Sequence, residues 1–154
     1  MPRFHPDESL LEFVGGQRVG VSRVVKAAKT LGVDLTKKVI SSREQIGRLL
    51  MQKLRIKREV PKGLIRWQLP QAPDCRHALF FIDYLYPYTR IPKHQHKDNT
   101  LHVVIFGSFV YETLEHTAGD WLYVPKKLPY SIISGAYGVL LCDVWYDEIP
   151  PEYT

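Results

Sequence analysis

A chain of 154 residues is long enough for one domain with a hydrophobic core, and its 45% hydrophobic content excludes a disordered protein. No apolar run approaches the roughly 20 residues that a membrane helix needs, and the first residues lack the apolar core of a signal peptide. The net charge of +5 is uneven, because residues 1–68 carry 15 Lys and Arg against 6 Asp and Glu, whereas residues 69–154 carry 6 against 10.

Residues 1–60 are predicted to form a basic, mainly helical extension. Helices are expected over Glu8–Val14, ending at Gly15, and from Ser22 to Leu31. Two overlapping capping boxes at Ser41 and Ser42 precede a stripe at helical spacing, formed by Ile46, Leu49, Leu50 and Leu54. The basic surface would suit an acidic partner, a second copy or, less favoured because no recognition motif is present, nucleic acid. The alternative is a solvated lysine-rich surface.

Residues 61–154 are predicted to form a β-rich unit, which begins at Pro61-Lys62-Gly63. Short apolar runs divided by turns favour an antiparallel sandwich or barrel. The expected strands are Leu64–Leu69, His77–Tyr86, Leu101–Phe106, Ser108–Leu114, Trp121–Val124, Tyr130–Ile133 and Val139–Tyr146. The two cysteines, Cys75 and Cys142, lie in no CxxC pattern, so free thiols and a cytoplasmic location are expected.

Two histidines, His94 and His96, lie two residues apart in an extended segment. Side chains alternate along a strand, so both imidazoles point to the same side. Converging imidazoles suit zinc, iron, copper or nickel.

From His94 onward the chain resembles the cupin superfamily. In the first cupin motif an HxH is followed at a fixed distance by a glycine, here Gly107, and in the second a glycine precedes a proline, here Gly119 and Pro125. The resemblance covers about residues 64–146 and implies a double-stranded β-helix, or jelly-roll barrel. The fold class expected is mostly β, with an N-terminal helical extension.

Two of the four cupin metal ligands are absent. Thr100 stands where the family has a glutamate, and Tyr130 where it has a histidine. His102 has the same strand parity as Thr100, so His94, His96 and His102 are predicted as metal ligands. The alternative for His102 is a hydrogen-bonded core histidine. Tyr130 is predicted as a fourth ligand or a proton donor, or else as a strand aromatic with a satisfied hydroxyl.

Within the superfamily, several short segments of this sequence are similar to those of 2,4'-dihydroxyacetophenone dioxygenases and of the cupin half of ChrR-type anti-sigma factors. The matching segments are Phe106–Tyr111, Leu114–His116, Ala118-Gly119 and Tyr123–Pro125. Those enzymes add a glutamate after the glycine turn, a role that Glu112 or Glu115 would fill, unless both are surface carboxylates. A histidine-and-carboxylate set suits non-haem Fe(II), with Zn(II) or Ni(II) as alternatives.

Aromatic side chains line either face of the run that follows residue 77. Tyr84 and Tyr86 share one face with Phe80 and Ile82, while Phe81, Asp83 and Leu85 share the other. The aromatics suit a small, partly apolar ligand, with Tyr84 and Tyr86 as substrate contacts, although such stripes are also common as packing. Arg90 is predicted to pair with a carboxylate or enolate of that ligand.

Three functions remain open from the sequence. The first is a metal-dependent enzyme acting on a small oxygenated organic molecule, by oxygen-dependent cleavage or by isomerisation. The second is a degenerate cupin that binds a ligand or assembles through its basic half. The third is a metal-free isomerase or epimerase with a histidine base and Tyr130 as acid, which needs a carboxylate to orient the histidine. A homodimer is expected, because an unpaired edge strand needs covering.

Overall fold

The computed structural model describes residues 8–146 and residue 152, and within these ranges it is mostly β. Its larger sheet has the strand order β3-β4-β5-β10-β7-β8, with β6 paired to β10 and β9 paired to β7. None of the described helices is long and apolar enough to cross a membrane. The strands of this sheet are β3 (Arg55–Ile56), β4 (Leu64–Gln68), β5 (Ala78–Leu85), β6 (Arg90–His94), β7 (Asn99–Tyr111), β8 (Leu114–Thr117), β9 (Trp121–Val124) and β10 (Tyr130–Tyr146).

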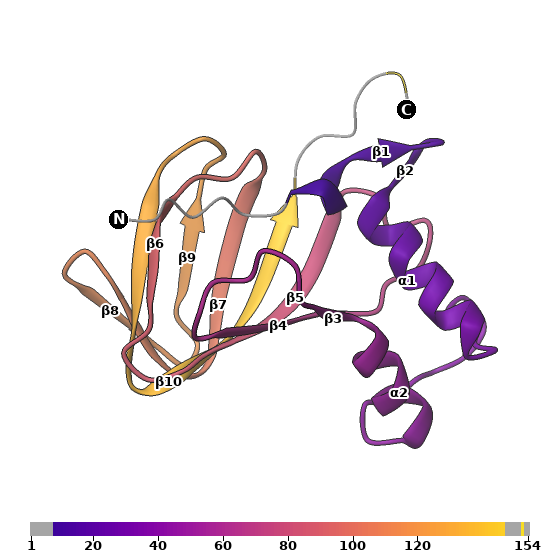
Figure 1. The fold of residues 1–154 in the computed structure, drawn as a ribbon, viewed down its shortest axis with the longest axis horizontal. Coiled ribbons are helices and arrows are strands. Elements are labelled where there is room, and N and C mark those ends of the chain that lie inside the picture. Colours follow the sequence, from indigo (N-terminus) through magenta and orange to yellow (C-terminus); the bar gives the residue numbers. More distant parts are fainter. Residues whose placement is uncertain (1–7, 147–151, 153–154) are drawn as a thin grey trace.

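Strand β10 holds the barrel together, because it pairs antiparallel with β5, β6 and β7. The sequence predicted two strands here, and the structure joins them into one that bends between Ser134 and Val139. Gly107 of β7 (φ +76°) crosses this bend, where a Cβ atom would lie 2.1 Å from the carbonyl oxygen of Gly138. The bend lets β7 and β10 pass from one side of the barrel to the other (Figure 1).

The N-terminal extension differs from the expected series of helices. The helix predicted over Glu8–Val14 is wrong, since this stretch forms a single 3-10 turn, η1 (Ser9–Leu11), and strand β1 (Phe13–Val14). Gly15 and Gly16 both adopt positive φ, which allows a two-residue hairpin turn into β2 (Gln17–Arg18).

Two helices follow, α1 (Val19–Thr30) and α2 (Gln45–Lys53), and both lie beside β3, β4 and β5 in Figure 1. Neither helix has a side-chain cap at its start, so the capping boxes predicted at Ser41 and Ser42 are wrong. Arg23 of α1 is structural, because it donates hydrogen bonds to Gln68 and to the carbonyl oxygens of residues 53, 54 and 55. Strand β3 joins the large sheet, which therefore begins before the expected boundary at residue 61.

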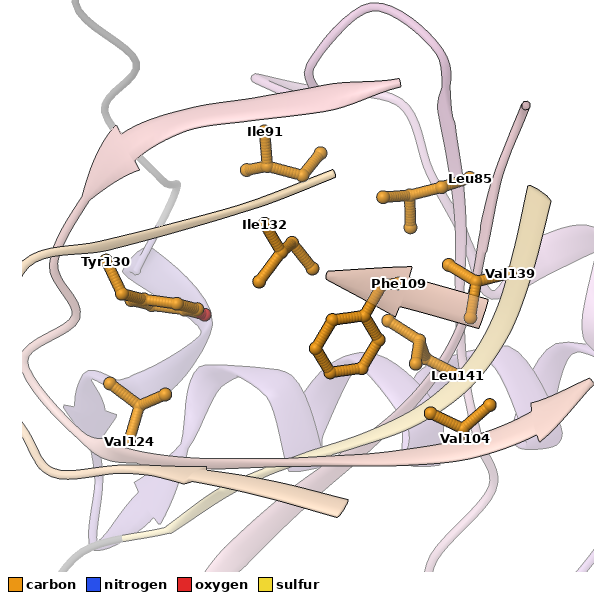
Figure 2. Close-up of a cluster of buried hydrophobic side chains, with 9 residues drawn as sticks. All are labelled: Leu85, Ile91, Val104, Phe109, Val124, Tyr130, Ile132, Val139 and Leu141. Atoms are coloured by element: carbon orange, nitrogen blue, oxygen red, sulfur yellow. The ribbon is translucent and has the colours of Figure 1, made fainter. Parts of the chain in front are cut away.

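The barrel core is an apolar cluster enclosed by both sides of the jelly roll (Figure 2). Tyr130 lies inside it at one end. A second cluster, in which Leu11 and Val21 contact Phe81 and Trp145, attaches the extension to the barrel. The residues of the barrel core are Leu85, Ile91, Val104, Phe109, Val124, Tyr130, Ile132, Val139 and Leu141.

The two faces of the large sheet have opposite chemistry. The inner face combines this core with buried polar side chains, while the outer face is apolar along five neighbouring strands. The inner polar residues are Gln68, Asp83, Thr100, His102 and Asp143. The residues of the outer face are Ile65, Trp67, Phe80, Ile82, Tyr84, Leu101, Val103, Ile105, Trp121, Tyr123, Leu140, Cys142 and Val144.

Candidate functional site

Strands β6, β7 and β10 bring the candidate residues to one end of the barrel. Tyr130 is paired in register with His94, and Asp143 with His102. Together with His96 they line a cavity in which water could fill about 30 Å³. A cavity this small admits water or a small group of a larger ligand.

His102 lies between a carboxylate and a phenol. Its Nδ1 is 2.5 Å from Asp143 Oδ1, and its Nε2 is 2.7 Å from the Tyr130 hydroxyl. Since a carboxylate accepts, Nδ1 carries the proton and donates, which leaves Nε2 to accept from the tyrosine O–H. Burial lowers the pKa of His102 to about 4 and raises that of Tyr130 well above its ordinary value. At neutral pH both groups are therefore uncharged and joined by one hydrogen bond.

Next to His102, the side chains of Arg66, Asp83 and Asp143 form a buried cluster of charged groups. Arg66 donates two hydrogen bonds to Asp83, of 2.7 and 2.6 Å, and its Nη2 lies 3.7 Å from Asp143. Burial, together with the charge of Asp143, raises the pKa of Asp83 to about 8 against the attraction of Arg66. Burial also raises the pKa of Asp143. Two carboxyl groups thus face one guanidinium, and one shared proton makes the cluster neutral.

His94 and His96 turn their Nε2 atoms toward each other, 3.1 Å apart. His94 Nδ1 donates to the carbonyl oxygen of Pro92 at 2.7 Å, so the neutral ring presents an Nε2 lone pair to His96. Burial is the main reason why the pKa values of both rings are lowered, that of His94 to about 4.

The two rings fit one shared metal ion. With metal–nitrogen distances of about 2.0–2.1 Å, two nitrogens 3.1 Å apart subtend an angle of about 95–100° at the ion. His96 Nδ1 is buried and makes no hydrogen bond within the described part of the chain, so an ion at Nε2 would settle which nitrogen of that ring carries its proton.

Other ligands are less well placed. Among the described residues no three His, Cys, Asp or Glu side chains form a group that could hold a metal. His102 is engaged by Asp143 and Tyr130, so the predicted three-histidine set stays a prediction that requires His102 to leave these partners. Thr100, in place of the cupin glutamate, is fully buried, and its hydroxyl has no hydrogen-bond partner in the described ranges.

The remaining predicted residues lie away from the histidines. Glu112 and Arg90 line a separate hollow of about 330 Å³, which also touches Tyr130. Glu115 is exposed on β8. Tyr84 belongs to the outer face, and Tyr86 lies beyond the end of β5 and is 49% exposed, so neither lines the histidine cavity. This placement differs from the expected one because Phe81, Asp83 and Leu85 are the residues of β5 that point inward.

Sequence reasoning missed the carboxylates of the site. Asp83 was assigned only to one of two possible faces, and Asp143 and Arg66 carry no local motif. Glu8 lies 88 positions before His96, yet its Oε1 accepts a 2.7 Å hydrogen bond from the Lys97 N–H and lies 3.5 Å from His96 Nδ1. Because side chains alternate along a strand, the orientation of a single neighbouring residue would have been enough to place Asp143 on the inner face.

No protein-family model matches this sequence, nor does any curated protein. Solved structures do match its fold. KdgF from a Halomonas species has a TM-score of 0.51 at 17% identity, over 58% of this chain and 84% of that one. The complex of Rhodobacter sphaeroides SigE with the anti-sigma ChrR has a TM-score of 0.50 at 18% identity, over 78% of this chain and 55% of that one. An RmlC-like cupin from Shewanella frigidimarina has a TM-score of 0.49 at 18% identity, over 62% and 85%.

At these identities the likeness concerns the fold alone. The chain has the jelly-roll fold of the cupins, and the fold predicted from HxH, Gly107, Gly119 and Pro125 is confirmed.

Proposed function

We propose that the chain is an enzyme that moves a proton on a small oxygenated organic molecule, as an isomerase or epimerase does. The observation that carries this proposal is the chain of hydrogen bonds from Tyr130 through His102 to Asp143, at 2.7 and 2.5 Å. Asp143 is the carboxylate that the metal-free hypothesis required to orient a histidine base.

Each residue has a distinct role in this proposal. Tyr130 lines the cavity and is the group that meets the substrate. When its oxygen takes a proton from a carbon next to a carbonyl, its own proton passes to His102 Nε2, and Asp143 stabilises the imidazolium that results. The reverse transfer returns a proton to a neighbouring atom, which isomerises the substrate, or to the other face of that carbon after the planar enolate has turned over in the site, which epimerises it. Because both groups are uncharged at rest, the two transfers occur together.

Deuterium exchange tests this role without a known substrate. A panel of small hydroxy acids, keto acids and sugars is incubated with the protein in D2O, and NMR follows exchange at carbons next to carbonyl groups. We expect at least one compound to exchange, and Tyr130→Phe and His102→Gln to slow the exchange by about 10²–10⁴-fold. Exchange that survives both substitutions would remove the proposal.

A second candidate is a metal-dependent enzyme, favoured by the facing Nε2 atoms of His94 and His96. These two rings would hold the ion, with Fe(II) as the first choice and Zn(II) or Ni(II) as alternatives. When bound, it supplies Lewis-acid chemistry or, as Fe(II), the oxygen chemistry of a non-haem dioxygenase. His94 and His96 would orient the oxygen atoms of the substrate toward Tyr130. Metal analysis of purified protein and of His94→Ala tests this candidate, which fails if neither contains stoichiometric metal.

We also propose that the outer face pairs with a second copy of this chain. An antiparallel sheet with one face in water normally alternates apolar and polar residues, whereas here the outer face is apolar too. Trp121, Tyr123 and Ile105 are 63%, 43% and 47% exposed on it. Strands β4, β5, β7, β9 and β10 carry no charged residue on this face, and the charge nearest to it, Arg55 of β3, lies at its edge over the Trp67 ring. Two copies can therefore meet at the centre of the face by a twofold axis without repulsion. Binding by the basic extension stays a prediction.

A further inference from the structure

We propose that Glu8 is a positioning residue for the histidine pair. Its carboxylate holds the proton of His96 on Nδ1 and thereby keeps the Nε2 lone pair of His96 directed at His94. This inference rests on the second candidate above, in which the two rings share a cation.

The tautomers of His94 and His96 decide whether the two rings can share a cation. His94 presents a lone pair at Nε2, because its Nδ1 donates to Pro92. If His96 donated from Nε2 to this lone pair, its Nδ1 would present a lone pair to the Glu8 carboxylate, 3.5 Å away. If His96 keeps its proton on Nδ1, the proton faces the carboxylate and the two Nε2 lone pairs converge across 3.1 Å. The second arrangement is the one that binds a cation.

The position of Glu8 is fixed independently of His96. Its Oε1 accepts from the Lys97 N–H at 2.7 Å, and its side chain is 9% exposed. Leu11, three residues later, is buried in the cluster that joins the extension to the barrel.

Arg18 supplies a second tie between the extension and the segment that follows His96. It is buried, lies 3.8 Å from Asp98, and donates to the carbonyl oxygen of Leu11 at 2.7 Å. Glu8 and Arg18 therefore hold Lys97 and Asp98, so the carboxylate cannot drift from the ring.

A carboxylate behind a metal-binding histidine has a recognised effect. It fixes the tautomer and raises the basicity of the coordinating nitrogen, and its loss typically weakens metal binding by about 10–100-fold. In this chain the carboxylate comes from the N-terminal extension and not from the barrel, so the extension becomes part of the site.

Glu8→Gln separates positioning from simple attachment. The amide oxygen can still accept from Lys97 N–H, while the amide N–H₂ can donate to His96 Nδ1 and favours the opposite tautomer. Two-bond ¹H–¹⁵N correlation spectra of ¹⁵N-histidine-labelled, metal-free protein identify the protonated nitrogen. We expect Nδ1–H for His96 in the original chain and Nε2–H in Glu8→Gln. Glu12→Gln, an exposed change on the same segment, is the control and leaves the tautomer unchanged.

Zinc titration against a chromophoric chelator is the second readout. We expect Glu8→Gln to weaken Zn(II) binding by about 10–100-fold, with an unchanged affinity in Glu12→Gln. A His96 tautomer that is the same in Glu8→Gln as in the original chain overturns the inference. Absence of zinc binding in every variant, with the tautomer switch intact, refutes the metal-dependent candidate and leaves the positioning role standing.

Discussion

The inner and outer faces of one sheet differ in their chemistry, because buried polar groups join the apolar core on the inner face while the outer face is apolar throughout. On the same three strands, Asp83, His102 and Asp143 point inward, while their neighbours Ile82, Val103 and Cys142 point outward. Buried polar groups are costly unless they are paired, so a sheet that keeps them inside does so for a site. An apolar outer face is also unfavourable in water, which favours the partner proposed for it.

Loss of a carboxylate from the inner face should have the largest effect on stability. Asp143→Ala leaves Arg66 with one partner and removes the acceptor of the His102 Nδ1–H, so we expect the free energy of unfolding to fall by about 3–5 kcal/mol. Urea denaturation followed by tryptophan fluorescence measures this change.

The matched outer-face control is the neighbouring residue. Cys142→Ala, one position away and pointing outward, should cost about 1 kcal/mol or less. Equal losses in the two variants would contradict the assignment of site and surface to opposite faces.

A charge on the outer face should break the proposed dimer. Ile105→Glu places two carboxylates near a twofold interface, so we expect dimerisation to weaken by about 100-fold, or about 2.7 kcal/mol. Sedimentation over a range of concentrations measures it. Val39→Glu introduces the same charge at a residue of the extension that is 91% exposed, and should leave the mass unchanged. A monomeric original chain would exclude the second copy as the partner of this face.

Strand parity explains how much of this arrangement the sequence could predict. It predicted that Asp83 and Tyr84 face opposite ways, and that His102 shares the face of Thr100, but it could not say which face is inside. Both faces of β5 are apolar or aromatic apart from Asp83, so hydrophobicity gave no direction.

Contacts between distant segments lay beyond sequence reasoning. Asp143 and His102 are 41 positions apart and meet because β7 and β10 pair in one register. A hairpin at Gly15 and Gly16 replaces the end of the expected first helix, and Glu8, at the start of that segment, accepts a hydrogen bond from Lys97, which is 89 positions away. These contacts depend on strand pairing between distant segments, which no local sequence pattern encodes.

The inner face should give stability an optimum near pH 6.5. His94 and His102 have pKa values of about 4 in the folded chain against 6.5 when unfolded, so the unfolded chain binds more protons and stability falls as pH drops from 6.5 to 4. Asp83 has a pKa of about 8 against 3.8, so the folded chain holds a proton that the unfolded one releases, and stability falls as pH rises toward 8.

Below pH 6.5 the lowered pKa values of His94, His96 and His102 outweigh the raised values of Asp83 and Asp143, and above pH 6.5 only the carboxyls act. Stability therefore falls on both sides, by about 1.4 kcal/mol per pH unit for each net proton. Urea unfolding at pH 5, 6.5 and 8 measures both sides. In Asp83→Asn we expect the alkaline decline to weaken and the acidic decline to steepen, whereas an alkaline decline of unchanged slope would exclude Asp83 as its cause.

The smallest change in the unfolding free energy is expected when a single hydroxyl group is removed from the inner face or added to the outer face. Thr100 is fully buried, and its hydroxyl has no hydrogen-bond partner in the described part of the chain. Thr100→Val removes that unpaired group at nearly constant shape, so we expect the unfolding free energy to rise by about 1 kcal/mol.

Val103→Thr makes the reverse exchange on the outer face of the same strand. In a monomer its hydroxyl would be hydrated and cost almost nothing, whereas in the dimer it is buried against the second copy and lowers stability by about 1 kcal/mol. The loss should therefore shrink when the protein is diluted below its dimer dissociation constant, and a loss that is independent of concentration would mean that this face is covered in some other way.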